Sequence, residues 1–164
     1  MSDDHDIERF EDLLQGFDHA MLVSVANDGS LHARPMAIAD SDGAALSFAT
    51  SNRSAKATEI TMRPGVAVVM QAAGAYLAIS GTARLVDDRA RVEVLWRDDW
   101  QLWFPEGPGD PALVLIEVDP DRAEYWDRTG ARRLEFLWEA GKAMAAGRRL
   151  SEKELSGHGK FTFG

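Results

Sequence analysis

Apolar positions recur along this chain with two different periods, which divide it into predicted helices and predicted strands. Near the start, apolar residues follow one another at spacings of three or four, as on one face of an amphipathic helix. These residues are Ile7, Phe10, Leu14 and Phe17. Beyond them the pattern changes to alternating and short continuous apolar runs, which predict strands. The predicted strands cover residues 20–27, 32–39, 44–49, 66–71, 76–86, 112–118 and 123–127.

Turn signals separate most of these strands by only a few residues. Asn27-Asp28-Gly29-Ser30 and Asp40-Ser41-Asp42-Gly43 predict two hairpins, because Asp and Gly tolerate the positive φ of tight turns. Asp119-Pro120-Asp121 predicts a further turn late in the chain. Strands joined by hairpin turns pair antiparallel. We therefore expect a mainly β fold, a closed or partly open antiparallel barrel with peripheral helices at its ends.

Three helices are predicted between and after the strands. Ser54 has the side chain of an N-cap, and the helix that it begins is expected over residues 55–63. A second helix is expected to start at Asp87-Asp88, and a last one covers about residues 134–145 before a polar tail. The second helix carries a tryptophan stripe, which is typical of a core or a subunit interface, with the last ring placed to face a ligand. The stripe consists of Trp96, Trp100 and Trp103.

Composition and charge restrict the function of the chain. Lys and Arg total 18 against 27 Asp and Glu, and the formal charge of -9 argues against nucleic acid or an anionic membrane as a partner. The chain has no cysteine, which excludes disulfides, zinc–thiolate sites and cysteine nucleophiles. The first residues are acidic, and no apolar run approaches the ~20 residues of a membrane span. We therefore expect one soluble, cytoplasmic domain over residues 1–164.

The segment from Thr50 to Lys56 runs from a predicted strand into a predicted helix and concentrates groups that bind anions. Its sequence, Thr50-Ser51-Asn52-Arg53-Ser54-Ala55-Lys56, offers hydroxyls, an amide, two cations and a helix N-terminus. Lys56 in the first helical turn opposes the helix dipole, and a bound anion reverses that penalty. An ordinary helix cap with solvated neighbours is the alternative. We interpret the segment as a site for a phosphate-bearing small molecule, most plausibly a nucleotide-type cofactor.

Another cation, Arg34, precedes Pro35 on a neighbouring predicted strand. Pro35 removes a hydrogen-bond donor from that strand, so the strand is expected to be an edge at this point. The edge either is ordinary or leaves backbone groups of Met36 and Ala37 free to pair with a planar heterocycle.

No group of residues in the sequence demands catalysis by protein side chains. The four histidines show no metal-ligand spacing, so no metal site is expected, and they are His5, His19, His32 and His158. A nucleophile elbow, a Walker loop and a Gly-x-Gly-x-x-Gly motif are all absent from the sequence. We predict no catalytic residue and expect any chemistry to come from a bound cofactor.

Three segments occur in a characteristic order: His32-Ala33-Arg34-Pro35-Met36, then Phe48-Ala49-Thr50-Ser51 with Ser54-Ala55-Lys56, then the run from Tyr76 to Ala83. In this order and spacing they closely resemble the pyridoxamine-phosphate-oxidase-like split-barrel flavoproteins. Later segments narrow the resemblance to the general stress protein branch, and these are Leu95-Trp96, Trp103 to Gly107, and Glu124 to Asp127. The resemblance covers about residues 7–128 and implies an antiparallel FMN-binding split β-barrel, followed by a C-terminal helix and tail over 134–164.

The resemblance also implies a homodimer that holds two FMN molecules in the grooves between its subunits. By position, it implies that Arg34 and Lys56 bind the flavin phosphate, with FAD as the second flavin that such a site admits. Hydroxyl groups are implied at Thr50, Ser51 and Ser54. The backbone of Arg34, Pro35 and Met36 is implied to line the flavin ring, over which Trp103 or Trp126 of the second subunit closes.

The sequence departs from true pyridoxamine phosphate oxidases at two positions. Tyr76 stands where those enzymes place a flavin-contacting glutamine. Ala55 stands where they place an arginine, so one phosphate cation is missing unless Arg53 replaces it. Their basic C-terminal motif for the substrate phosphate is also absent. We therefore do not expect the chain to synthesise pyridoxal phosphate.

Together these observations predict an FMN-binding general stress protein that acts as a flavin-dependent oxidoreductase, with NAD(P)H as the electron source and a small molecule as the acceptor. The alternative is a protein that holds, buffers or senses flavin without turnover. A deazaflavin-dependent reductase, a haem protein and a barrel with a decayed site are further alternatives on the same fold. The acidic balance of the chain disfavours the deazaflavin, and the placement of His32 and His158 disfavours haem.

Overall fold

Antiparallel strands make up most of the computed structural model, which describes residues 2–147, 149 and 158–163. The strands form one sheet in the order β3-β2-β1-β4-β5-β6-β7, and an additional pairing of β3 with β6 closes the first six into a barrel. The predicted fold class, a mainly β antiparallel split barrel with peripheral helices, is confirmed. The strands are β1 (His19–Val25), β2 (Leu31–Asp42), β3 (Ala45–Ser51), β4 (Gly65–Ala72), β5 (Ala75–Val86), β6 (Leu113–Asp127) and β7 (His158–Thr162).

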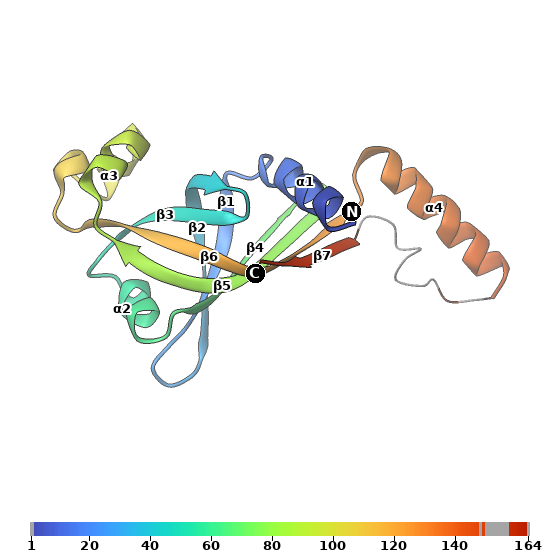
Figure 1. Cartoon of the computed structure of the whole chain (residues 1–164), viewed down its shortest axis with the longest axis horizontal. Helices are drawn as coiled ribbons and strands as arrows, with labels where there is room; N and C mark the ends of the chain where they lie inside the picture. The colour runs from blue at the N-terminus through green and yellow to red at the C-terminus, as the bar shows by residue number, and fades with distance from the viewer. Residues whose placement is uncertain (1, 148, 150–157, 164) are drawn as a thin grey trace.

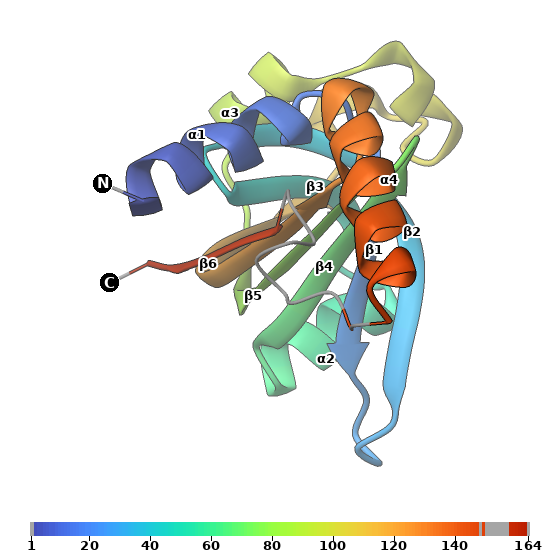
Figure 2. The ribbon, with the colours of Figure 1, turned by 90° about the vertical axis from the view of Figure 1, so that its right-hand side faces the viewer.

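Helices surround the barrel rather than forming a second layer. Figure 1 and Figure 2 both show α1 and α2 on opposite sides of the strands, and Figure 1 places α3 and α4 at opposite ends of the long axis. The α-helices are α1 (Ser2–Leu14), α2 (Ala55–Met62), α3 (Arg89–Leu95) and α4 (Gly130–Ala145). Two short 3-10 helices follow α3, η1 (Asp98–Leu102) and η2 (Gly107–Gly109). The connection between β5 and β6, residues 87–112, contains α3, η1 and η2, and we call it the cap.

Alternate side chains of the strands fill the barrel. In β5 every second residue from Ala75 to Ala83 is buried, and the residues between them are exposed or partly exposed, as the alternating pattern of the sequence predicts. The first helix covers the barrel through Phe10, which is fully buried and meets the ring of Phe161 edge-to-face at 5.5 Å. This contact ties α1 to β7, although the two elements lie near opposite ends of the chain. A second apolar cluster joins the cap to the barrel and includes Val92, Trp100, Phe104, Leu113 and Leu115.

The predicted turn at Asp119-Pro120-Asp121 is wrong, because β6 runs without interruption through these residues for 15 positions. A register shift between Ser80 and Gly81 of β5 absorbs the irregularity, so that Pro120 faces Gly81. The approach is very close: a Cβ on Gly81 would lie 2.1 Å from the carbonyl oxygen of Asp119. The proline therefore marks a bulge within one long strand and not the end of a strand.

The helix predicted to carry the tryptophan stripe is also interrupted. It ends at Trp96, whose backbone is extended (φ -53°, ψ 136°), and the chain re-enters helical geometry as the 3-10 turn η1. Trp100 is consequently buried and packs edge-to-face on Trp96 at 5.9 Å, whereas Trp103 is 77% exposed. The three rings therefore do not form one stripe.

The C-terminal part differs from the prediction in two respects. The last helix begins at Gly130, four residues before the predicted start, and β7 was not predicted. Of the predicted tail, residues 148, 150–157 and 164 lie outside the described residues. The strand β7 pairs with the second half of β6, from Arg122 to Trp126.

Candidate functional site

A cavity of about 590 Å³ lies between the barrel and the cap, and it brings together eight of the nine predicted site residues. Those eight are Arg34, Pro35 and Met36 on β2, Thr50 and Ser51 at the end of β3, Ser54 and Lys56 at the start of α2, and Trp103 after η1. The cap adds Asp99, Trp100 and Phe104, which the sequence interpretation did not assign to a site. Polar groups therefore gather at the α2 end of the cavity and aromatic groups at the cap end.

The N-terminus of α2 is formed as the sequence predicts. Ser54 has an extended backbone and accepts a hydrogen bond from the backbone N–H of Ala57 at 3.3 Å, which is an N-cap. Its Oγ also lies 3.3 Å from Oγ1 of Thr50. The first turn of α2 contains no acidic residue. The hydroxyls and the positive end of the helix therefore point to one corner of the cavity, which suits an anion.

The ammonium group of Lys56 in this corner has a lowered pKa. Burial lowers the pKa of its ammonium group, and the neighbouring charge of Arg34 lowers it further, while Glu59 acts in the opposite direction. Burial and the charge of Arg34 both disfavour the charged form of Lys56. An anion placed between Lys56 and Arg34 would relieve them, so the electrostatics favour a negatively charged ligand.

Glu59 holds Arg34 in place, and the sequence interpretation missed it. Its carboxylate accepts hydrogen bonds from Arg34 at 3.0 Å and from the hydroxyl of Ser24 at 2.5 Å, and it lies 2.7 Å from Nδ1 of His32. The hydrogen bond from Ser24 is the largest cause that lowers the pKa of Glu59 to about 2, and burial opposes it. The sequence gives one indication that Glu59 belongs to the site: it lies three residues after Lys56, so the two share a face of the predicted helix.

The edge predicted at Pro35 is confirmed by the pairing of β2. Among the described strands, residues 31–37 pair only with β1, and pairing with β3 begins at Ile38. Over residues 31–37 the second edge of β2 therefore has no partner strand in the described part of the chain. Pro35, Met36 and Ala37 line the cavity at this edge, where a planar ring can approach the backbone.

Trp126 is the one predicted site residue that lies elsewhere. It lines a second, more apolar cavity of about 600 Å³ on the outer face of the strands, together with Met21, Val69 and Tyr76. Its ring stacks on His158 of β7 with the ring centroids 5.1 Å apart. Within one chain, the structure therefore does not bring Trp126 to the cavity of the other eight residues.

Within residues 2–147, 149 and 158–163, no group of three or more His, Asp or Glu side chains is arranged to hold a metal ion. None of the helices in that part of the chain is both long and apolar enough to span a membrane.

The barrel, its cap and the anion-suited corner define a split-barrel protein with a cavity for a phosphate-bearing ligand. The sequence matches the family described as pyridoxamine 5'-phosphate oxidase like over residues 5–151. The chain belongs to this family. No curated protein matches the chain significantly.

Solved structures support the same assignment. The chain is 28% identical to general stress protein 26 from Bacillus anthracis, with a TM-score of 0.68 over 74% of this chain and 93% of the other. It is 26% identical to the general stress FMN/FAD binding protein of Xanthomonas citri, with a TM-score of 0.64 over 79% and 92% of the two chains. A structure from Jannaschia sp. CCS1, 24% identical, shares the fold over 99% of this chain and 100% of its own, with a TM-score of 0.73.

Proposed function

We propose that this chain binds FMN in the cavity between the barrel and the cap. The observation that carries the proposal is the union, in one cavity, of a two-cation corner at the N-terminus of α2 with an aromatic wall from the cap. A ligand with a phosphate at one end and a planar ring system at the other matches this division. Similarity to an FMN/FAD binding protein at 26% identity supports the choice of a flavin.

The residues present fit the phosphate end of such a ligand. Arg34 and Lys56 supply the charge, and both line the same corner. Hydroxyl donors come from Thr50, Ser51 and Ser54, and N–H groups come from the first turn of α2. The pKa of Lys56, lowered by burial and by the charge of Arg34, supports a negatively charged ligand in this corner.

The residues of β2 and of the cap fit the ring end. The free backbone edge at Pro35 and Met36 can hydrogen-bond a planar heterocycle, and Trp103 lies at the mouth of the cavity. When bound, a flavin supplies hydride and electron transfer, and the protein orients it and tunes its redox state. We propose that NAD(P)H is the electron source and that a small molecule is the acceptor, in the cytoplasm.

We propose that the working unit is a homodimer. Trp126 and Tyr76 lie in the outer apolar cavity, so they can reach the flavin only from a second copy of the chain. The partly exposed apolar side chains around them, Met21, Val69 and Tyr76, suit burial against that copy. The ring of Trp126 would then close over the flavin of the partner.

Flavin binding without turnover is the second candidate. It is favoured by the lining of the cavity, in which Arg34 is paired with Glu59 and we predict no catalytic residue. Steady-state oxidation of NADH and NADPH by the flavin-loaded protein, with a panel of small acceptors, separates the two candidates. Turnover above the rate of free FMN supports the enzyme, and its absence supports the binding protein.

The decisive first experiment is a titration of the purified protein with FMN, followed by visible absorption and flavin fluorescence. We expect saturable binding with one FMN per chain and much weaker binding of riboflavin, which lacks the phosphate. FAD, a deazaflavin and haem are titrated in parallel. Absence of FMN and FAD binding, or equal affinity for FMN and riboflavin, would overturn the proposal.

A further inference from the structure

The cap closes one side of the cavity, but its helices are too short to fix their own position. The helix α3 has seven residues, and η1 and η2 have five and three. Isolated helices of this length are not stable in water, so docking on the barrel decides where they lie. Apolar packing supplies part of the docking through Val92, Trp100 and Phe104. Apolar packing is not directional, which leaves open what fixes the exact placement.

A row of polar residues crosses the barrel beneath α3. The strand registers pair Asp40 of β2 with Ser47 of β3, Ser47 with Glu117 of β6, and Glu117 with Arg84 of β5. These residues are therefore direct neighbours across four adjacent strands. Ser47 is almost fully buried, and only 14% of the Glu117 side chain is exposed.

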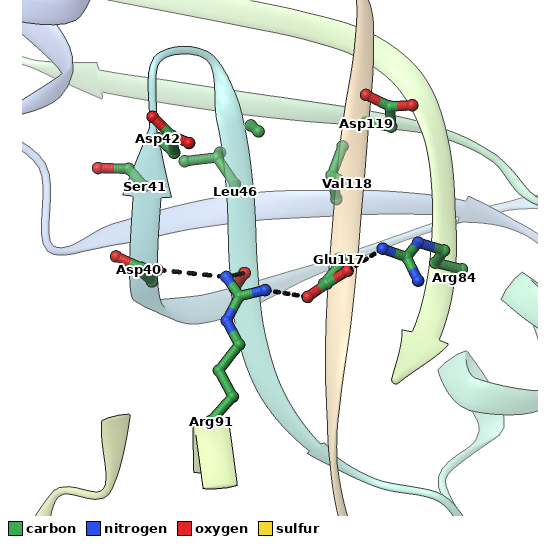
Figure 3. A pocket seen from close by; sticks show the side chains of 11 residues that line it. Asp40, Ser41, Asp42, Leu46, Arg84, Arg91, Glu117, Val118 and Asp119 are labelled. Carbon is green, nitrogen blue, oxygen red and sulfur yellow. Dashed lines mark hydrogen bonds and ion pairs between the residues drawn. The ribbon is translucent and has the colours of Figure 1, made fainter. Parts of the chain in front are cut away.

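Arg91 of α3 binds three of the four residues in this row. Figure 3 shows its guanidinium group between the strands, pointing at Asp40 on one side and at Glu117 on the other. Its Nη2 donates to Asp40 at 3.2 Å and to Ser47 at 3.0 Å, and its Nη1 forms an ion pair with Glu117. The fourth residue, Arg84, pairs with the second carboxylate oxygen of Glu117 and comes from β5, not from the cap.

Two of the three strands that Arg91 binds, β2 and β3, also line the cavity. Asp40 lies four residues beyond Met36 on β2, and Ser47 lies three residues before Thr50 on β3. The cap continues from Arg91 to Trp100 and Trp103, which line the opposite wall. A planar guanidinium with several N–H donors in a fixed fork constrains both distance and orientation. The contacts of Arg91 therefore link the cap directly to the strands of the facing wall.

We propose that Arg91 is a positioning residue for the flavin cavity, which holds the aromatic wall of the cap at a fixed distance from β2 and β3. The proposal rests on the flavin site proposed above. Arg91 lines no part of that cavity; it borders a separate polar hollow of about 270 Å³ with Asp40, Ser47 and Glu117. Its effect on the flavin is therefore indirect, through Trp100 and Trp103.

The test compares Arg91→Ala with Arg84→Ala, a matched control that removes the other arginine of Glu117 but no link to the cap. In Arg91→Ala we expect FMN affinity to fall by roughly five- to thirtyfold, in the upper part of the range over which residues outside a site change its affinity. We also expect brighter fluorescence from bound FMN, because an indole ring in contact with a flavin quenches it. Arg84→Ala should stay within about twofold of wild type in affinity, a change near the limit for distant surface residues.

Arg91→Ala is expected to fold, because Glu117 keeps Arg84 as a partner and the hollow admits water. If it does not fold, Arg91→Lys replaces it, since lysine keeps the charge but loses the fork that spans the strands. Wild-type affinity and fluorescence in the folded variant would overturn the proposal. Equal losses in Arg91→Ala and Arg84→Ala would also overturn it, because they would assign the effect to Glu117 and not to the cap.

A flavin-free measurement separates this proposal from the proposed function. Hydrogen exchange of the backbone amides of Trp100 and Trp103 reports the stability of the cap, since both amides are hydrogen-bonded within it. We expect faster exchange at both amides in Arg91→Ala but not in Arg84→Ala. If the wild-type protein binds no flavin, the proposed function fails, while this comparison still shows whether Arg91 fixes the cap. Unchanged exchange in Arg91→Ala would contradict it.

Discussion

Arg34 donates a hydrogen bond to Glu59 over 3.0 Å, although the two residues lie 25 positions apart on a strand and a helix. Ser24 joins them, since its hydroxyl accepts from Arg34 at 3.0 Å and donates to Glu59 at 2.5 Å. One of the two cations of the cavity is thus held by a carboxylate before any ligand binds. The pKa of Lys56, the other cation, is lowered first by burial and then by the charge of Arg34.

Replacing both cations should abolish FMN binding. A hydrogen bond to a charged group is worth about 1.5–3 kcal/mol, and each 1.4 kcal/mol changes affinity about tenfold, so Arg34→Ala with Lys56→Ala should weaken FMN binding by at least roughly 100-fold. Fluorescence titration measures the loss. Arg63→Ala, at the far end of α2, is the control and should bind FMN as wild type does. Unchanged affinity in the double variant would refute the phosphate assignment.

The Glu59 carboxylate should stabilise the fold in a pH-dependent way. Its folded-state pKa is about 2, below the ordinary 4.5, chiefly because Ser24 donates to it. The stabilisation is therefore complete above about pH 4.5 and is lost as the pH falls toward about 2. Urea unfolding of wild type and Glu59→Gln across this range should show a gap in unfolding free energy that narrows with falling pH. A gap independent of pH would contradict the prediction.

FMN binding should become weaker in alkaline solution. Burial and the charge of Arg34 place the pKa of Lys56 below its ordinary 10.5 in the free protein, and a bound phosphate should raise it again. Binding then takes up a proton as the pH approaches 10.5, so the dissociation constant rises with pH. Lys56→Arg, which stays protonated, serves as the control and should show a flatter profile. Parallel profiles would exclude Lys56 as the titrating group.

Mixing two variants that each bind flavin poorly should restore flavin binding if Trp126 acts from the second subunit. One variant carries Arg34→Ala with Lys56→Ala, and the other carries Trp126→Ala. In a mixed dimer, the intact cation corner of the second chain faces the intact Trp126 of the first, which rebuilds one complete site. Flavin fluorescence of the re-associated mixture, compared with each variant alone, measures the recovery. No recovery in a mixture shown to contain mixed dimers would place Trp126 outside the site.

Gly81→Ala should destabilise the barrel without touching the cavity. The new Cβ would stand 2.1 Å from the carbonyl oxygen of Asp119, a contact with backbone that cannot rotate away. We expect the unfolding free energy to fall by about 2 kcal/mol or more, as for other overpacked sites. A Cβ at Gly65 would have no atom within 4 Å, so Gly65→Ala should change the unfolding free energy by less than about 1 kcal/mol. Urea unfolding of both variants is the measurement, and equal stabilities would show that the bulge relaxes.

The sequence was sufficient for features that depend on local chemistry. The Asp-Gly turn, the Ser54 cap and the strand edge at Pro35 each follow from the backbone preferences of a few adjacent residues, and the structure has all three. The convergence of β2, β3 and α2 on one cavity followed from the resemblance to a family. Within the family, the order of the motifs fixes which strands are neighbours.

Features that depend on tertiary context were not predictable in the same way. Asp119-Pro120-Asp121 has turn chemistry, but Gly81 on the neighbouring strand makes room for it inside β6. From the sequence, Glu59 resembles an ordinary exposed residue of a helix. Its role in holding Arg34 depends on contacts with residues of β1 and β2, such as Ser24 and His32. The helix α3 stops before Trp96, and the sequence spacing of the tryptophans does not indicate this break.

The long strand β6 changes partner halfway along its length, with residues 113–118 next to β3 and residues 122–126 next to β7. Unpaired N–H and C=O groups on a strand invite the strand of another molecule to add to them. The strand β7 pairs with the part of β6 that β3 does not reach, so it covers the backbone groups at that edge. We expect that removing residues 158–162 would leave this part of β6 open to edge-to-edge association with another molecule.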